Sequence, residues 1–300
     1  MGNFSLLTLN CFGAPGWNTT LRLRQLGEEL NQSDYAIACL QEVQTHYYRR
    51  LLIEACNHFY PAQAYKDFLH APKGGLLTFS RSKLRRVQFQ LFADRGLWYT
   101  PALADWILHK GVLISESECD DMPVIVMNTH LTANYTGDWS RSSVFARQEC
   151  RELMQIAGLV HAQPRDALVI VCGDFNIPRG SWMYDQFINE SGMIDPLADD
   201  MRPTFRPHAM MGNHYAAPID FTFYRPPENV SMQVESTLRF QDKIHIGGRR
   251  LHLSDHVAIE ARFSWETSSP DPFSKQTCLP EKEQEVHRDA PDMQAGKTSL

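Results

Sequence analysis

Val169-Ile170-Val171-Cys172-Gly173-Asp174-Phe175-Asn176-Ile177-Pro178 is the stretch of this 300-residue chain that decides its fold. It opens with a short apolar run rich in β-branched side chains, which predicts a strand buried on both faces. Asp174 and Asn176 follow directly, where such a sheet would border a pocket. Asp and Asn also favour simple turns, so this stretch alone leaves both a turn and a functional site open.

The same arrangement, an apolar strand with polar side chains at its end, recurs along the chain. The predicted strands cover 4–9, 35–40, 124–127, 219–223 and 257–259. The polar residues at their ends are Asn10, Glu42, Asn128 with His130, Asp220, and Asp255 with His256. Any one of them could begin an ordinary loop, but a repeated pattern indicates a shared site.

Amphipathic segments between the strands predict helices over 19–30, 45–55, 142–161 and 181–189. In the first of these, Leu21, Leu26 and Leu30 form the expected buried stripe, with Arg22 outside it. Strands that alternate with helices over the first 58 residues are typical of a layered α/β fold.

The predicted domain spans residues 1–265 as one unit. The segment 266–300 is rich in Pro, Ser, Glu and Lys and poor in apolar residues, which predicts a disordered polar tail.

Composition narrows the class of protein. The formal net charge of −6 argues against a surface that grips a nucleic-acid backbone everywhere. The seven cysteines are scattered without a Cys-x-x-Cys pair, which suits a reducing compartment. Strand-like sequence begins by Phe4, which leaves no room for a signal peptide, and no apolar run is long enough to span a membrane. We therefore expect a monomeric, cytoplasmic protein.

The residue types at the strand ends suit a hard metal ion. Carboxylate and amide oxygens of Glu42, Asp174, Asn10 and Asn176 match the preferences of Mg²⁺, with Mn²⁺ as the alternative, whereas zinc favours Cys or clustered His. Histidines accompanied by acids supply a base and a phosphate partner. This is the equipment for hydrolysis of a phosphate ester.

Six motifs resemble, in order and approximate spacing, those of the endonuclease/exonuclease/phosphatase superfamily. They are Leu-Asn at 9–10, Gln-Glu at 41–42, Asn-Thr-His-Leu at 128–131, Gly-Asp-Phe-Asn at 173–176, Ile-Asp at 219–220 and Ser-Asp-His at 254–256. The resemblance covers nearly the whole domain and implies a four-layer α/β sandwich, in which two mixed sheets pack face to face with helices outside. Within the superfamily, Leu9-Asn10-Cys11-Phe12-Gly13 and His130-Leu131-Thr132-Ala133-Asn134-Tyr135 are most similar to neutral sphingomyelinases.

The resemblance implies roles for the metal ligands and the base. Glu42 would be the main Mg²⁺ ligand, assisted by Asn10, and Asp255 would bind a second metal or shape the site. His256 would be the general base, with Asp220 orienting its ring.

The resemblance also implies residues that face the phosphate. Asp174 and Asn176 would position the water and the phosphoryl oxygens. His130 would donate to the phosphate or the leaving group, and Asn128 would support it as a substrate-binding residue. Lys110 would neutralise phosphate charge, with a solvated lysine before a turn as the alternative interpretation.

The resemblance implies a phospholipid substrate, hydrolysed at a membrane surface to phosphocholine and a neutral lipid. Aromatic residues between Phe89 and Trp106 are candidates for contact with the membrane, although half of them are as readily core residues. A nuclease would use the basic run Arg81, Lys83, Arg85 and Arg86 instead. An inositol-phosphate phosphatase and a catalytically inactive binding module are two further hypotheses that the sequence leaves open.

Overall fold

The computed structural model describes residues 2–94, 107–208, 212 and 215–266. The strands are β1 Gly2–Asn10, β2 Ile37–Gln41, β3 Ala62–Ala64, β4 Leu77–Ser80, β5 Arg86–Leu91, β6 Gly111–Cys119, β7 Met122–His130, β8 Leu168–Asp174, β9 Asp220–Arg225, β10 Met232–Arg239, β11 Ile244–Ile246, β12 Arg249–Leu251 and β13 Ala258–Trp265. The helices are α1 Thr19–Gln32, α2 His46–Cys56, α4 Val144–His161 and α5 Trp182–Ser191, and a 3-10 turn, η1, covers Lys73–Gly75.

Within these residues, two mixed sheets form the centre of the fold. One runs β10-β13-β1-β2-β4-β3, the other runs β5-β6-β7-β8-β9, and β11 pairs with β12 as a separate hairpin. Each large sheet contains one parallel pair, β1 with β2 and β7 with β8, while the other pairings are antiparallel. Parallel pairs need crossover connections, and the helices α1 and α4 supply them.

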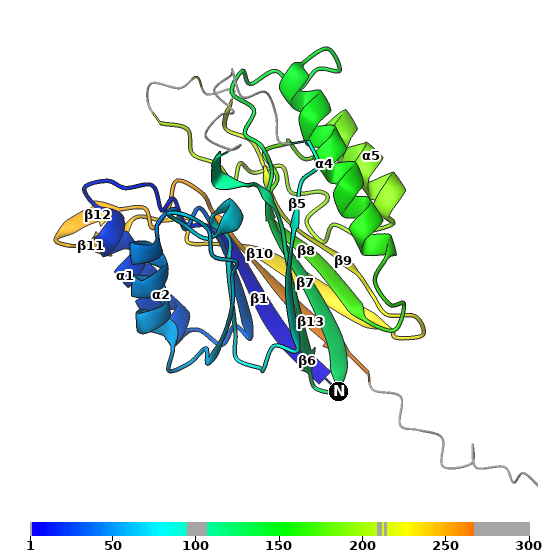
Figure 1. Cartoon of the computed structure of the whole chain (residues 1–300), viewed down its shortest axis with the longest axis horizontal. Helices are drawn as coiled ribbons and strands as arrows, with labels where there is room; N and C mark the ends of the chain where they lie inside the picture. The colour runs from blue at the N-terminus through cyan, green and yellow to red at the C-terminus, as the bar shows by residue number, and fades with distance from the viewer. Residues whose placement is uncertain (1, 95–106, 209–211, 213–214, 267–300) are drawn as a thin grey trace, which may run out of the picture. The chain divides into compact units, whose positions relative to one another are not determined.

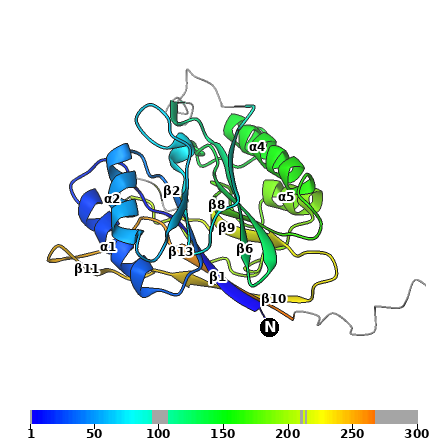
Figure 2. The same ribbon diagram turned by 60° about the horizontal axis from the view of Figure 1, so that its bottom comes forward.

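Three apolar layers hold the sandwich together. Between the sheets pack residues such as Phe4, Val126 and Phe263. Helices α1 and α2 cover the outer face of the β1–β2 sheet, and α4 and α5 cover that of the β7–β8 sheet, as both views show (Figures 1 and 2). This is the predicted four-layer α/β sandwich, and the prediction is confirmed.

The two parallel pairs place the predicted polar residues at one end of the sandwich. β1 and β2 end with Asn10 opposite Gln41, directly before Glu42, and β7 and β8 end with His130 opposite Asp174. Since strands of a parallel pair end at the same edge, each sheet presents two of these side chains together.

Three helix starts are capped by a hydroxyl side chain. Thr45, Ser143 and Ser181 precede α2, α4 and α5, and each side-chain oxygen accepts a backbone N–H three residues on. Helix α1 begins at Thr19, as predicted, but the side chain of Asn18 before it makes no capping bond.

Leu21 and Arg22 of α1 occupy the opposite of their predicted environments. Leu21 is 40% exposed, whereas Arg22 is 7% exposed. Arg22 is buried because its guanidinium donates to the carbonyl oxygens of Cys11, Phe12 and Leu253 at 3.1, 2.6 and 3.0 Å. These are tertiary contacts that helical periodicity does not reveal.

The segment proposed for membrane contact is only partly described. Phe92 is 1% exposed and belongs to the core under α4 and α5, so the prediction is wrong for this ring. Phe89 is partly buried and packs against Ala64, Leu76 and Leu113. Residues 95–106, with the remaining aromatics of that segment, lie outside the described residues.

Strands β3, β10, β11 and β12 were not expected from the sequence. β3, β11 and β12 are only three residues long, and the inner positions of β10 are mostly only partly buried, so none of the four carries a run of buried apolar residues. Of the predicted tail 266–300, only Glu266 is described. No helix in the described ranges is long and apolar enough to cross a membrane.

Thr222 offers a test of the packing between the sheets. Its hydroxyl is buried on β9 opposite Cys172 and has no hydrogen-bond partner among the described residues. Because a buried polar atom without a partner costs about 1–3 kcal/mol, Thr222→Val is expected to raise the free energy of unfolding by about 1 kcal/mol in denaturant titration.

Thr78→Val is the matched control. The Thr78 hydroxyl is also buried, but it accepts from Asn128 Nδ2 at 3.2 Å. Its removal should lower stability, and equal effects of the two substitutions would contradict the assignment of Thr222.

Candidate active site

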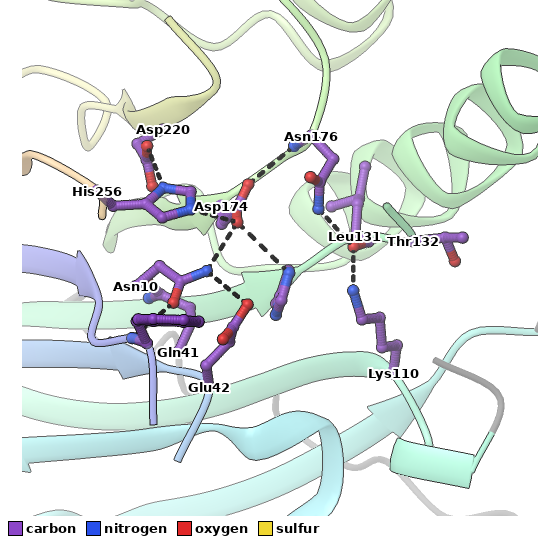
Figure 3. A network of polar contacts seen from close by, with 12 residues as sticks. Asn10, Gln41, Glu42, Lys110, Leu131, Thr132, Asp174, Asn176, Asp220 and His256 are labelled. Atoms are coloured by element: carbon purple, nitrogen blue, oxygen red, sulfur yellow. Dashed lines mark hydrogen bonds and ion pairs between the residues drawn. The ribbon is translucent and has the colours of Figure 1, made fainter. Parts of the chain in front are cut away.

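A pocket of about 360 Å³ lies at the end of the sandwich where the strand ends meet. The predicted site residues that line it are Glu42, Lys110, His130, Asp174, Asn176, Asp255 and His256. Asn10 and Asp220 lie directly behind this set and hydrogen-bond to it. Figure 3 shows the side chains of this set that it labels converging from both sheets; they are Asn10, Glu42, Lys110, Asp174, Asn176, Asp220 and His256.

Asn10 joins the two halves of the site. Its Nδ2 donates to Glu42 Oε1 at 3.0 Å and to Asp174 Oδ2 at 2.9 Å (Figure 3). Its Oδ1 accepts the backbone N–H of Phe12 at 3.0 Å, which fixes the orientation of the amide. In this arrangement Asn10 orients two carboxylates, and one of the two lone pairs of its oxygen, the atom that a metal would bind, is engaged.

His256 and Asp220 form a buried hydrogen-bonded pair. His256 Nδ1 lies 2.9 Å from Asp220 Oδ2, and its Nε2 points toward Asp174 Oδ2 at 3.6 Å (Figure 3). Burial alone would lower the pKa of His256, but the facing carboxylates of Asp220, Asp174 and Asp255 outweigh it and raise the pKa to about 10.

Asp174 is the centre of the polar network. Its Oδ2 faces His130 Nε2 at 3.4 Å and His256 Nε2 at 3.6 Å, and its Oδ1 accepts from the backbone N–H of Asn176 at 3.0 Å. Burial raises the pKa of this carboxyl, while His256 and the Asn10 amide oppose the shift. The carboxylate is therefore held by partners on all sides.

Gly173 is required by the close approach of β7. Its φ is 140°, and a Cβ at this position would lie 1.9 Å from the carbonyl oxygen of Thr129. Asn176, with φ 54°, adopts the left-handed conformation that Asn tolerates. Backbone conformation therefore accounts for the glycine and the asparagine of the Gly-Asp-Phe-Asn motif.

Glu42 also has a left-handed backbone, with φ 58°, which is unusual for Glu. Two glycines pack against it: a Cβ at Gly13 would lie 2.1 Å from the Glu42 carbonyl oxygen, and one at Gly75 would lie 3.2 Å from its Cα. The surrounding loops therefore fix a conformation that costs about 1–3 kcal/mol and turns the carboxylate into the pocket.

Lys110 and Asn176 converge on one backbone oxygen. Lys110 Nζ and Asn176 Nδ2 donate to the carbonyl of Leu131 at 2.5 and 2.9 Å (Figure 3). Lys110 is only 3% exposed and lines the pocket, so the interpretation of a solvated lysine does not hold. Burial lowers the pKa of His130 well below its usual value, and Lys110 and His256 lower it further.

Asn128 lies away from the pocket. It is fully buried, and its Nδ2 donates to the carbonyls of Leu40 and Leu77 at 3.2 and 3.3 Å, while its Oδ1 accepts from Gln41 at 2.8 Å. These bonds tie β7 to β2 and β4. Contact with a substrate, the predicted role, does not fit this position, whereas support of the strand ends does.

The donor set fits a hard cation. Among the described residues, Asp174, Asp220 and His256 place ligand atoms within 4.8 Å of one another. Asp220 and His256 already bond each other, however, whereas the carboxylates of Glu42, Asp174 and Asp255 line the pocket and offer hard oxygen donors, although their oxygens are not all within 4.8 Å of one another. Burial raises the pKa of Glu42, and nearby Asp255 adds to the shift. A divalent cation would relieve this repulsion.

Sequence patterns missed much of the pocket wall. Its aromatic residues are Phe12, Tyr135, Trp139, Phe205 and Tyr215. Phe12 and Tyr135 belong to the two motifs that resemble neutral sphingomyelinases, so the sequence could point to them. The other three aromatic residues lie in loops, where no periodic pattern marks them. Trp139 is fixed by donation from its indole N–H to the Asn176 carbonyl at 2.9 Å.

Two curated relatives are similar to part of the chain. Human sphingomyelin phosphodiesterase 2 is 27% identical over 182 residues, which cover 58% of this chain and 42% of that protein. Inositol phosphosphingolipids phospholipase C of Schizosaccharomyces pombe is 30% identical over 182 residues, covering 57% and 41%. The chain thus matches less than half the length of either relative.

Solved structures share the fold. Beta toxin of Staphylococcus aureus, in a variant with bound magnesium ions, superposes with a TM-score of 0.67 at 15% identity, covering 86% of this chain and 99% of that one. D. rerio TDP2 in complex with a single-strand DNA product gives 0.66 at 17% identity, covering 87% and 99%.

The family model of the Endonuclease/Exonuclease/phosphatase family matches residues 7–256, from the first strand to His256. These residues include all the groups that converge on the pocket. The chain therefore belongs to the Endonuclease/Exonuclease/phosphatase family.

Proposed function

We propose that this protein is a metal-dependent phosphodiesterase that cleaves sphingomyelin-type phospholipids into phosphocholine and a neutral lipid. The observation that carries the proposal is the buried cluster of Glu42, Asp174 and the His256–Asp220 pair at the floor of one pocket. The similarity to sphingomyelin phosphodiesterase 2 supports the substrate class.

In the proposed mechanism, His256 takes the proton of the attacking water, which requires a neutral ring. A cation held by the facing carboxylates of Asp174 and Asp255 would offset their charge and lower the raised pKa of His256 toward that form. Its Nδ1 is engaged by Asp220 at 2.9 Å, so Nε2 is the nitrogen that faces the pocket. Asp220 fixes the ring and stabilises the imidazolium that forms, as the acid of a catalytic triad does. Asp174 and Asn176 border the place where water and phosphate would meet, and His130 and Lys110 would face the phosphoryl oxygens. As water adds to phosphorus, the P–O bond to the lipid would break, and the departing alkoxide would take up a proton from His130 or from solvent.

Mg²⁺, or Mn²⁺ in its place, would be held by Glu42 with Asp255 and Asp174, and Asn10 would orient two of these carboxylates. When bound, the ion would polarise the phosphoryl group and neutralise developing charge. Positioning of the substrate and proton transfer remain tasks of the chain's own residues.

The walls of the pocket suit a choline headgroup. Aromatic rings from Phe12, Tyr135, Trp139 and Tyr215 border the acidic floor, and rings of this kind bind quaternary ammonium groups through cation–π attraction. An inositol headgroup, which is neutral and rich in hydroxyls, would make less use of them.

Nucleic acid is the second candidate substrate, and the basic run offers it little support. Arg85 is paired with Glu118, and Arg86 with Glu116. Arg81 donates to the carbonyl of Ser33. The charges of Arg85 and Arg86 are therefore partly neutralised within the protein, which reduces their attraction for phosphates, whereas Arg81 keeps its charge.

His256→Ala should abolish most hydrolysis of sphingomyelin. Loss of a general base lowers kcat by about 10²- to 10⁴-fold, measured as release of phosphocholine from sphingomyelin vesicles with Mg²⁺. His58→Ala, which removes an exposed histidine outside the pocket, is the control and should leave the rate unchanged. Full activity of His256→Ala would rule out the mechanism.

Glu42→Gln should weaken metal binding. Loss of the main carboxylate is expected to reduce affinity for Mn²⁺ by roughly 100-fold or more, measured by calorimetry or Mn²⁺ paramagnetic resonance without substrate. Glu54→Gln, at an exposed position of α2, is the matched control. Equal Mn²⁺ affinity in both variants would exclude Glu42 as a ligand.

Tyr135→Leu should weaken binding of the choline headgroup selectively. A cation–π contact of about 1–2 kcal/mol predicts a rise in KM of ~5- to 30-fold for sphingomyelin, with little change for an inositol phosphosphingolipid. Tyr135→Phe keeps the ring and should retain the original KM.

The same assay with plasmid DNA separates the two substrate classes. DNA nicking without phosphocholine release would overturn the lipid assignment and leave the phosphodiesterase chemistry intact.

A further inference from the structure

We propose that Thr204 and Arg206 are positioning residues that set the hydrogen bond between His256 and Asp220. The catalytic consequence of this inference rests on the proposed hydrolytic function. The hydrogen bonds from which it is argued do not depend on that function. Neither residue belongs to a helix or to one of the two large sheets, and neither stood out in the sequence.

The pair that they would position spans both sheets. Asp220 opens β9 in one sheet, whereas His256 stands two residues before β13 in the other. A small slip of one sheet against the other would lengthen the 2.9 Å contact between them. Some structure must therefore hold the two strand starts in register.

Thr204 bonds to both strand starts. Its Oγ1 accepts the backbone N–H groups of Ile219 and Asp220, each at 3.0 Å. Its carbonyl oxygen accepts the N–H of Val257 at 2.7 Å. This fully buried residue thus connects the start of β9 to the segment that carries His256.

Arg206 holds the other side of the His256 segment. Its backbone N–H donates to the carbonyl of Asp255 at 2.8 Å, and its Nη1 donates to the carbonyls of Ser254 and His256 at 3.1 and 2.9 Å. Three consecutive carbonyls therefore receive bonds from one residue. Such a set leaves the loop little freedom to rotate.

Further bonds anchor Arg206 to the rest of the sheet. Its Nη2 donates to the carbonyls of Phe240 and Gln241, directly after β10, at 3.2 and 2.8 Å. Between the two positioning residues, the ring of Phe205 lies 5.0 Å from the His256 ring and lines the pocket. The segment 204–206 is thus continuous with the catalytic floor.

Two variants test the proposal, each with a matched control. Thr204→Val removes the acceptor that serves Ile219 and Asp220, and Thr222→Val makes the same change on β9 where the hydroxyl has no partner among the described residues. Arg206→Met removes the donors to Ser254 and His256. Arg225→Met removes an arginine that likewise bonds backbone carbonyls, those of Val160 and Pro164, but outside the pocket.

The first measurement needs no substrate. The Nδ1–H of His256 should give a far-downfield proton resonance, assigned by its absence in His256→Ala. We expect this signal to broaden or vanish in Thr204→Val and Arg206→Met, and to persist in Thr222→Val and Arg225→Met. Thr204→Ser keeps the hydroxyl and should restore it.

The second measurement is steady-state hydrolysis of sphingomyelin. Misplacement of the base should lower kcat by ~10- to 100-fold with KM unchanged, and Thr204→Ser should recover the rate. Circular dichroism and thermal unfolding confirm that the variants are folded. If Thr204→Val does not fold, Arg206→Met and Thr204→Ser carry the test.

Folded variants that keep both the downfield signal and kcat would overturn the proposal, as would equal losses in Arg225→Met. Loss of the signal in a protein that hydrolyses none of the substrates would support the positioning role and count against the proposed function instead. The two hypotheses can therefore fail separately.

Discussion

The carboxylate of Asp174 is the constraint around which the site is built. It is buried at the end of β8, and a buried charge is tolerated only when surrounding donors replace the lost water. The amide of Asn10 and the backbone N–H of Asn176 supply those donors, and the rings of His130 and His256 face the carboxylate at 3.4 and 3.6 Å. The polar contacts around the Asp174 carboxylate therefore bring together residues that lie up to 246 positions apart in the chain, from Asn10 to His256.

The sandwich provides the rigidity that this cluster needs. The parallel strand pairs in the two sheets place Asn10, Glu42, His130 and Asp174 at the same end of the sandwich. Three apolar layers hold the sheets and helices in fixed positions. The backbone of Glu42 is strained, because it adopts a left-handed conformation. The close packing of Gly13 and Gly75 against it makes this conformation possible. Stability from the core thus offsets strain at the pocket.

The choice of substrate depends on parts of the pocket that differ in kind from the catalytic floor. The floor is suited to phosphodiester chemistry in general, and the fold is shared with proteins whose names refer to both lipid and DNA. The aromatic wall and the internally paired arginines favour a choline-type lipid over a nucleic acid in the proposed function. In the proposed function, the loops around the pocket therefore set the substrate specificity, whereas the residues at the strand ends carry out the hydrolysis.

The sequence pattern by itself indicated a layered α/β fold, and the resemblance to the endonuclease/exonuclease/phosphatase superfamily implied its four layers. The pattern also marked most of the polar pocket floor, because buried strands and the polar residues at their ends can be recognised in one dimension. The sequence placed Glu42, Asp174 and His256 in one site. It assigned Asn128 to the substrate and Arg22 to the surface, whereas each is buried in bonds to distant backbone groups. Only the tertiary structure decided those roles, the aromatic wall and the contacts of Thr204 and Arg206. Their side chains act through carbonyls and rings contributed by other segments, and such partners leave no periodic trace in the sequence.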